Sequence, residues 1–180
     1  AAAASRLGLP FIHVSTDYVF DGRASRPYRE DDPVAPLGAY GRSKRAGEIA
    51  VLEAMPQAVI VRTAWVFHHG GANFLRTMLR LAETRDEVGV VADQRGAPTY
   101  APDLAVALVA MIERMKADGT AAPGGLFHAT GSGETTWHGF AAAIFAGAAR
   151  RGLKVPALKA IAKADYPTPA RRPAYSVLDC

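Results

Sequence analysis

The chain has 180 residues, of which 49% are hydrophobic and 21% charged, a composition that is typical of a folded globular domain and excludes a disordered protein. The formal net charge of +4 is small, and no block of lysine and arginine with interleaved aromatic residues occurs, so nucleic acid is not favoured as a partner. A single cysteine, Cys180, excludes a disulfide framework, and no apolar stretch is long enough to span a bilayer. Because no signal-peptide pattern is visible either, we expect a cytoplasmic protein with no membrane partner.

The first predicted elements are a strand, a long loop and a helix. Residues 10–15 form a short apolar run typical of a buried strand. Residues 21–39 contain several prolines and glycines and are predicted to form a loop, and loops of this length are usually functional. Residues 40–54 have the pattern of a helix, which Pro56 terminates.

The rest of the chain repeats this alternation of strand and helix. Further strands are predicted at 58–63, 88–91 and 126–129 and around Ile161. Further helices are predicted to begin after Asn73, near Pro102, and after Thr135 or Thr136, because these residue types cap or start helices. The alternation predicts an α/β protein with a parallel sheet that is covered by helices.

Polar residues follow two of the predicted strands. The segment HVSTDYVFDG places Ser15, Thr16 and Asp17 at the end of the first strand, and Trp65 lies just beyond the second. In open parallel sheets, ligands bind beyond the carboxyl ends of the strands. We therefore expect a binding site at this edge of the sheet, although Trp65 in the core is an alternative.

The segment YGRSK contains a tyrosine and a lysine, Tyr40 and Lys44, four residues apart on the first long helix. Side chains at this spacing lie on the same side of a helix. A phenol is a weak acid-base group near neutral pH, and a nearby ammonium lowers its pKa. The pair can therefore act as a proton donor, with a hydroxyl such as that of Thr16 binding the same substrate oxygen. The alternative is a chance match, in which Lys44 only pairs with Glu48.

Several blocks of sequence, spread from residue 13 to residue 179, resemble the dTDP-4-dehydrorhamnose reductases, which are extended short-chain dehydrogenase/reductases. The blocks are HVSTDYVFDG, YGRSKRAGE, VRTAWVF, NFLRTMLRLA, DQRGAPTYAPDLA, GGLFHATGSGETTWHGFAAAIF and DYPTPARRPAYSVLD. The resemblance implies a Rossmann-like, doubly wound parallel sheet with a small C-terminal substrate-binding portion. It implies one NAD(P)-binding reductase domain over residues 1–180, with 64–72, 92–102 and 130–180 on the substrate side.

The resemblance also implies a reaction and a set of roles. The reaction is reduction of dTDP-4-dehydro-6-deoxy-L-mannose to dTDP-L-rhamnose by NADPH, with NADH as an alternative cofactor. Tyr40 would protonate the C4 oxygen, Thr16 would hydrogen-bond it, and Lys44 would hold the nicotinamide ribose and tune Tyr40. Asp17 and Trp65 would contact the substrate. A homodimer and a Mg²⁺ ion at the dimer contact stay open, with no ligand residue assigned.

The glycine-rich turn that binds the dinucleotide pyrophosphate in this fold is missing from the sequence. Gly131-Ser132-Gly133 is the nearest cluster, but Thr136 stands where the third glycine is needed. We therefore expect a fragment without the first βαβ half and the extreme C-terminus, whose activity alone is doubtful.

Other residues carry weaker signals. Trp137 begins an apolar helix stripe, which favours a core position, and one of Arg171 and Arg172 is a candidate for the substrate diphosphate. The adjacent His68 and His69 are poorly spaced for one metal, so no metal ligand is predicted. A second class of function is a non-catalytic binding subunit on the same fold, similar to the regulatory subunit of methionine adenosyltransferase, and a nearer alternative is another sugar-nucleotide reductase or an epimerase.

Overall fold

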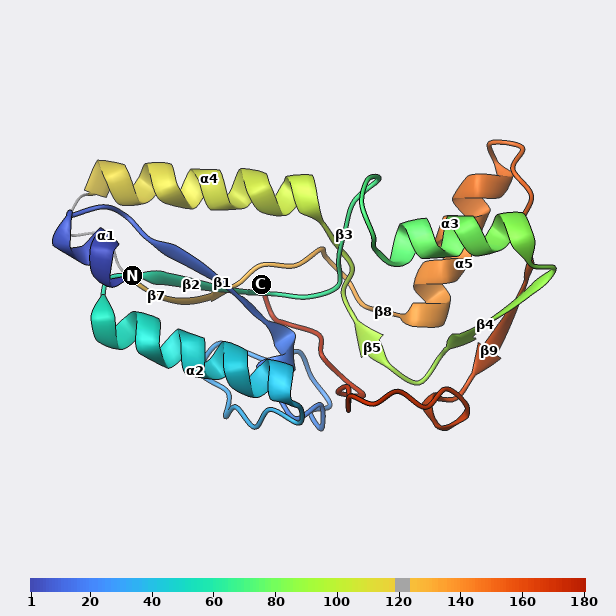
Figure 1. Cartoon of the computed structure of the whole chain (residues 1–180), viewed down its shortest axis with the longest axis horizontal. Helices are drawn as coiled ribbons and strands as arrows, with labels where there is room; N and C mark the ends of the chain where they lie inside the picture. The colour runs from blue at the N-terminus through green and yellow to red at the C-terminus, as the bar shows by residue number, and fades with distance from the viewer. Residues whose placement is uncertain (119–123) are drawn as a thin grey trace.

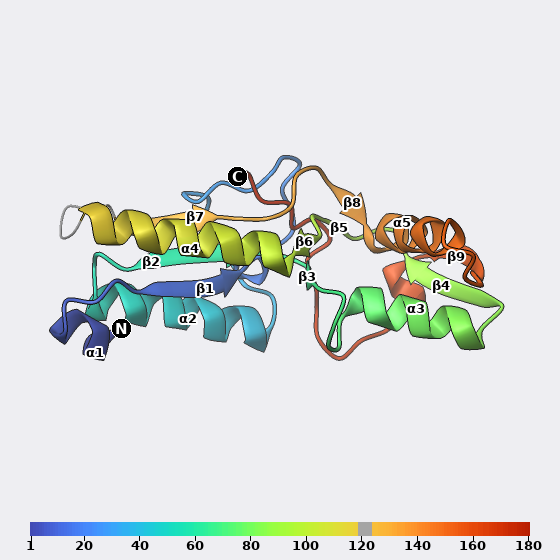
Figure 2. The same cartoon turned by 90° about the horizontal axis from the view of Figure 1, so that it is seen from above.

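The computed structural model describes residues 1–118 and 124–180, which form two groups of elements side by side (Figure 1). The first group is built on a parallel sheet in the order β1-β2-β7, whose strands are Ile12–Thr16, Val59–Thr63 and Gly125–His128. Helix α2 (Ala39–Ala54) and helix α4 (Ala101–Asp118) lie on opposite sides of this sheet (Figures 1 and 2). The predicted helix at 40–54 and the strands at 10–15, 58–63 and 126–129 are thus confirmed to within two residues.

Alternation along the strands explains why the two faces of this sheet differ. On the α4 face, Val59 and Val61 pack against Met115 and its apolar neighbours on the helix. The opposite face carries Ser15 and Arg62, which are directly paired in the parallel register. Successive side chains of a strand point to opposite faces, so one face has an apolar core and the other has a polar layer beneath α2.

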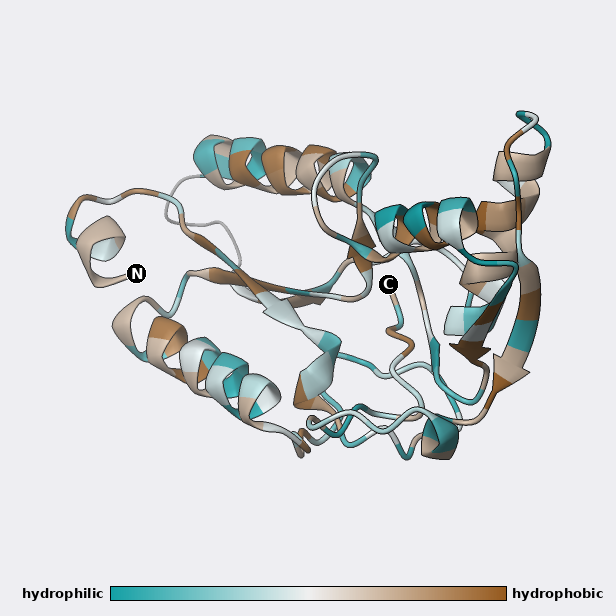
Figure 3. Ribbon diagram, turned by 45° about the vertical axis from the view of Figure 1, so that its right-hand side comes forward, coloured by the Kyte–Doolittle hydropathy of each residue, from teal (hydrophilic) through white to brown (hydrophobic). Residues whose placement is uncertain are grey.

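The second group contains α3 (Phe74–Thr84), β4 (Glu87–Val91), α5 (Trp137–Ala149) and β9 (Ala157–Ile161). Its core is an apolar cluster drawn from three of these elements: Met78, Ala82, Val88, Val90, Phe140, Ala141, Ile144 and Phe145. Apolar residues, brown in Figure 3, occur along its strands and in α5. The predicted caps are confirmed, because Asn73 accepts a hydrogen bond from the Arg76 amide and Thr136 accepts one from the Gly139 amide.

The alternation of strands and helices predicted that the strand at 88–91 joins the first sheet. This prediction was wrong. The strand pairs in parallel with β9 instead, in a separate sheet of two strands. The alternation of strand and helix identifies parallel strands, but it does not say which strand is the neighbour. Here helix α3 packs on α5. Strand β4 follows α3 directly in the chain and therefore lies in the second group as well.

The remaining elements are short. They are α1 (Ala2–Arg6), η1 (Asp17–Val19), β3 (Val66–Phe67), β5 (Arg95–Gly96), β6 (Thr99–Tyr100), β8 (Thr135–Thr136) and η3 (Lys163–Asp165). Strand β3 pairs with β6, and β5 pairs with β8, so the chain crosses between the groups several times. No helix in residues 1–118 and 124–180 combines the length and the apolar character needed to cross a membrane.

Candidate active site

All five residues predicted to form a site line one open cleft of about 510 Å³. The cleft lies beyond the carboxyl ends of β1 and β2, at the N-terminal end of α2, where the sequence predicted a site. Its lining residues are Val14, Ser15, Thr16, Asp17, Tyr18, Tyr40, Lys44, Thr63, Ala64, Trp65, Val66 and Trp137. The most distant of the five, Thr16 and Trp65, are 49 positions apart in the sequence, and the fold brings them to the same cleft.

Tyr40 and Lys44 both face the cleft from the first turns of α2. The Tyr40 ring is 58% exposed and packs edge-on against Tyr18, with ring centroids 5.8 Å apart. The Lys44 ammonium donates a hydrogen bond to the Val14 carbonyl at 2.6 Å. Lys44 is therefore held against strand β1, and Glu48 makes its ion pairs with Arg45 and Arg62 instead.

Thr16 and Asp17 form a buried pair at the end of β1. The Thr16 hydroxyl donates to Asp17 Oδ1 at 3.0 Å and accepts from the Tyr18 amide at 3.2 Å, which caps the short helix η1. Asp17 is only 2% exposed, and its Oδ2 has no hydrogen-bond partner among the described residues. Burial raises the pKa of the Asp17 carboxyl to about 6, although the hydroxyls of Ser176 and Thr16 counteract this effect.

Trp65 is held in an unusual conformation between two neighbours. Its φ of 47° lies in the left-handed region, which is uncommon for a residue other than glycine. The indole stacks on Trp137 with centroids 3.5 Å apart, and a Cβ on Gly96 would lie 2.5 Å from the Trp65 ring. Strained backbone of this kind persists only where its surroundings hold it, which is common at binding sites.

The interpretation of Trp137 as a core residue was incomplete. Trp137 packs against the apolar cluster of the second group, and it also lines the cleft. Tyr18 is a further lining residue, to which no role is assigned from the sequence. Its place directly after Thr16 and Asp17 was a usable signal, whereas the stacking of Trp137 on Trp65 depends on contacts between distant segments.

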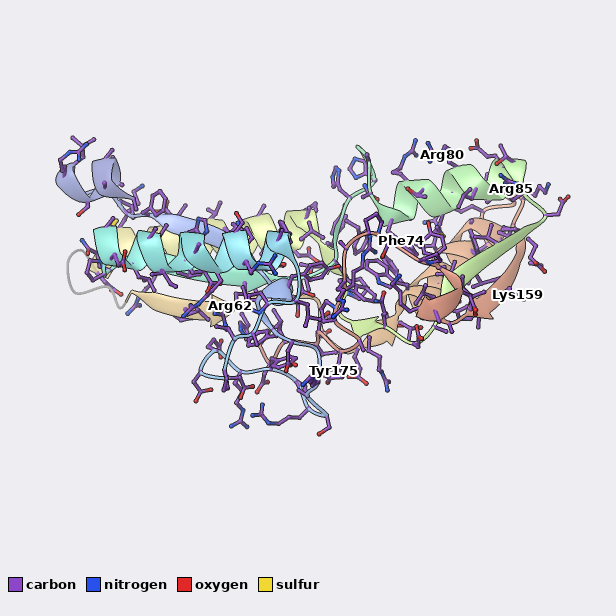
Figure 4. The ribbon with its side chains drawn as sticks, turned by 60° about the horizontal axis from the view of Figure 1, so that its bottom comes forward. Arg62, Phe74, Arg80, Arg85, Lys159 and Tyr175 are labelled. Atoms are coloured by element: carbon purple, nitrogen blue, oxygen red, sulfur yellow. The ribbon has the colours of Figure 1, made fainter. Side chains whose placement is uncertain are left out.

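A second cavity of about 310 Å³ adjoins the cleft and shares Trp137 with it. Its walls are mostly apolar and come from α3 and β4; Phe74, one of them, is labelled in Figure 4. Its polar lining includes the amide of Gln94 and the positive groups of Lys163 and Arg172. Arg172, one of the two candidate arginines, thus lies in a cavity next to the predicted site.

The described residues contain no group of three or more His, Cys, Asp or Glu side chains that could hold a metal ion. The rings of His68 and His69 contact each other at a tilt, with centroids 3.7 Å apart and an angle of 43° between the planes. Within residues 1–118 and 124–180, we therefore assign no ligand to the Mg²⁺ ion, whose presence stays an open question from the resemblance.

A parallel sheet with a Tyr-x-x-x-Lys helix at the carboxyl ends of its strands defines a protein of the short-chain dehydrogenase/reductase class. Within that class, the family described as RmlD substrate binding domain matches residues 1–180, and the chain belongs to this family.

Several relatives that the chain resembles are named dTDP-4-dehydrorhamnose reductase. It is 50% identical over 183 residues to the dTDP-4-dehydrorhamnose reductase of Sinorhizobium fredii (strain NBRC 101917 / NGR234), with 100% of this chain and 61% of the relative covered. It is 51% identical over 187 residues to the enzyme of that name from Burkholderia thailandensis, with 99% and 62% covered. The crystal structure of the Bacillus anthracis dTDP-4-dehydrorhamnose reductase in complex with NADP matches with a TM-score of 0.88 and 36% identity, over 99% of this chain and 59% of that one. The chain spans about 60% of the length of these relatives.

Proposed function

We propose that this chain is the substrate-binding and proton-donating part of an NADPH-dependent dTDP-4-dehydrorhamnose reductase. The reaction is reduction of dTDP-4-dehydro-6-deoxy-L-mannose to dTDP-L-rhamnose, the last step of dTDP-rhamnose synthesis. The observation that carries the proposal is the convergence of Thr16, Tyr40 and Lys44 on one cleft at the end of a parallel sheet. The identity of 50% to a reductase of this name supports the choice of substrate.

The residues of α2 fit a dinucleotide beside the cleft. Lys44 uses one of its three ammonium protons on the Val14 carbonyl, so two remain for ribose hydroxyls. When bound, NADPH supplies the hydride. We assign the ribose contact to Lys44 and to the neighbouring Tyr40, with NADH as the alternative cofactor.

Reduction of a ketone requires a proton donor for the carbonyl oxygen, on which negative charge develops. Tyr40, exposed at the mouth of the cleft, is assigned to donate this proton from its phenol. The Thr16 hydroxyl is assigned to stabilise the same oxygen by a hydrogen bond. Thr16 has a single proton, which Asp17 accepts in the structure, so the hydroxyl must turn from Asp17 to the sugar oxygen.

We assign the rest of the substrate to the remaining walls. Asp17 Oδ2, which is buried and unpaired among the described residues, accepts a hydrogen bond from a sugar hydroxyl. Trp65 covers the sugar, and Arg172 contacts the diphosphate in the second cavity. The division predicted from the sequence, in which 64–72, 92–102 and 130–180 contribute the substrate side, stays a prediction. The cytoplasmic location and the homodimer stay predictions.

The test measures NADPH oxidation with the keto-sugar nucleotide in a protein that contains this chain within the full length of its relatives. Replacement of Tyr40 by Phe is expected to lower kcat by about 100-fold or more, because it removes the proton donor, while the protein stays folded. Tyr28→Phe removes a phenol outside the cleft and outside the predicted substrate side, and is the control. Lys44→Ala is expected to lower kcat and also to raise the KM for NADPH.

The alternatives predict different results. A non-catalytic binding subunit would give equally inert wild-type and Tyr40→Phe proteins, together with a synthetase partner in a pull-down. An epimerase would invert a sugar centre without net oxidation of the cofactor, which analysis of the product distinguishes from reduction.

A further inference from the structure

A buried ion pair joins helix α2 to the sheet beneath it. Glu48 is fully buried and Arg62 is 1% exposed. Two parallel hydrogen bonds connect them, from Arg62 Nε to Glu48 Oε1 at 2.8 Å and from Arg62 Nη2 to Glu48 Oε2 at 2.9 Å. Ser15 donates to Oε1 at 2.6 Å and Arg45 donates to Oε2 at 2.9 Å, so the carboxylate has four donors. Arg62 is labelled in Figure 4, beside α2.

Stability alone does not account for this pair. Removing two charges from water costs several kcal/mol per ion, and apolar residues of similar volume are often as stable or more stable. Burial also raises the pKa of the Glu48 carboxyl, but the hydrogen bonds from Arg62 and Ser15 outweigh burial and hold the pKa below its usual value. The pair is therefore ionised at neutral pH, and its best-attested use is to specify how elements pack.

The position of the pair connects it to the cleft. Glu48 lies four residues after Lys44 and eight after Tyr40, on the same side of α2. Its partners on the strands, Ser15 and Arg62, immediately precede Thr16 and Thr63, which line the cleft. A shift of α2 along or about its axis would break the paired bonds and would move the tyrosine and the lysine away from the strand ends.

We propose that Glu48 and Arg62 are positioning residues that hold α2 in the rotation and register that bring Tyr40 and Lys44 to Thr16. Neither side chain lines the cleft, so the pair acts through the helix and the strands. The inference rests on the proposed function of the same site.

The first test compares two single variants with a matched control in the same full-length protein. Glu48→Gln and Arg62→Lys are expected to lower kcat by about 10- to 100-fold with little change in KM for the keto-sugar, because a misplacement of about 1 Å has effects of this size. The control is Arg45→Ala, which removes one hydrogen bond to Glu48 but leaves the link to the strand intact. Its kcat should stay within about 3-fold of wild type, since Arg45 lies at the partly exposed rim.

A double variant separates positioning from stability. Glu48→Met combined with Arg62→Met replaces both charges by apolar side chains and is expected to recover the Tm that the single variants lose, as apolar replacements of buried pairs do. If its kcat stays low while its Tm recovers, positioning is supported. If kcat returns to the wild-type value together with Tm, or if Arg45→Ala is as impaired as Glu48→Gln, the proposal is overturned.

Crystal structures of the wild type and of Glu48→Gln give a readout that needs no turnover. A displaced α2, with Tyr40 and Lys44 withdrawn from Thr16, supports the inference, whereas an unmoved helix refutes it. If the wild type does not reduce the keto-sugar at all, the proposed function fails, and these structures still decide whether the pair positions the two side chains.

Discussion

At the scale of single residues, Asp17 combines a cost to stability with a use in binding. Its carboxyl is 2% exposed, and one of its oxygens has no partner among the described residues. Burial raises the pKa of this carboxyl in the folded chain to about 6, from its usual value of 3.8. The protonated form is therefore favoured by folding, and the stabilisation that protonation provides is complete below pH 3.8 and is lost as the pH rises through about 6.

We expect Asp17→Asn to stabilise the protein at pH 8 by up to about 3 kcal/mol, because it removes a buried charge, and to have little effect near pH 4. The measurement is Tm of both proteins at the two pH values. The same variant should weaken substrate binding, since the acceptor oxygen changes. A gain in Tm that is equal at both pH values would show that charge is not the cause.

Trp65 gives a second prediction at this scale. Its indole is stacked on Trp137 and lines the cleft, so Trp65→Ala should raise KM for the keto-sugar nucleotide more than it lowers kcat. The residue packs against the apolar cluster of the second group but is only partly buried, so Tm should fall by only a few degrees. Steady-state kinetics and a thermal melt check both points, and a drop of more than about 10 °C would favour a core role instead.

At the scale of elements, helix α2 carries Tyr40 and Lys44, and its close approach to η1 depends on a glycine. A Cβ on Gly41 would lie 2.1 Å from the Tyr18 carbonyl oxygen and 2.9 Å from Pro36 Cβ. The Tyr18 backbone cannot move aside as a flexible side chain can. Because Gly41 has no side chain, the first turn of α2 can pack directly against η1.

Gly41→Ala should therefore push α2 away from η1 and destabilise the protein by about 1 to 3 kcal/mol, with a loss of turnover. Gly47→Ala in the same helix is the matched control. Its Cβ would lie 3.4 Å from the His13 ring, and alanine favours a helix, so its stability should be unchanged or higher by up to about 1 kcal/mol. Urea unfolding of both variants is the measurement; equal losses would mean that the contact at Gly41 is not responsible.

At the scale of the whole molecule, the two groups of elements meet at Trp137, which belongs to both cavities. One cavity holds the residues assigned to the sugar, and the other holds Arg172. A nucleotide sugar that occupies both would connect the two groups. Ligand binding should thus stabilise the molecule as a unit.

We expect dTDP-L-rhamnose at about 100 times its Kd to stabilise the protein by about 2.7 kcal/mol, which raises Tm by several degrees. Arg172→Ala should lose most of this shift because the diphosphate loses a positive contact. Lys154→Ala, which removes an exposed ion pair with Asp86, changes the net charge by the same amount and should keep the shift. If both variants keep the ligand-induced rise in Tm, Arg172 does not contact the nucleotide. Rhamnose without the nucleotide is a further control and should not change Tm.

The sequence by itself determined most of the local structure and identified five residues that line the cleft. The apolar periods predicted the strands and helices, Asn73 and Thr136 were recognised as caps, and Tyr40 and Lys44 were placed on one side of a helix, because these features depend only on near neighbours in the chain. The expectation that polar strand ends meet at one edge then brought Thr16 and Asp17 to the same cleft.

Only the tertiary structure decided the pairings between distant segments. The neighbour of strand β4, the stacking of Trp137 on Trp65, and the choice of Arg62 rather than Lys44 as the partner of Glu48 all join residues that local patterns leave unconnected. Each depends on which faces pack against each other once the chain has folded. Burial and the fit between packed surfaces decide which of the alternative partners a residue contacts. The spacing of residues along a single helix or strand contains no information on either.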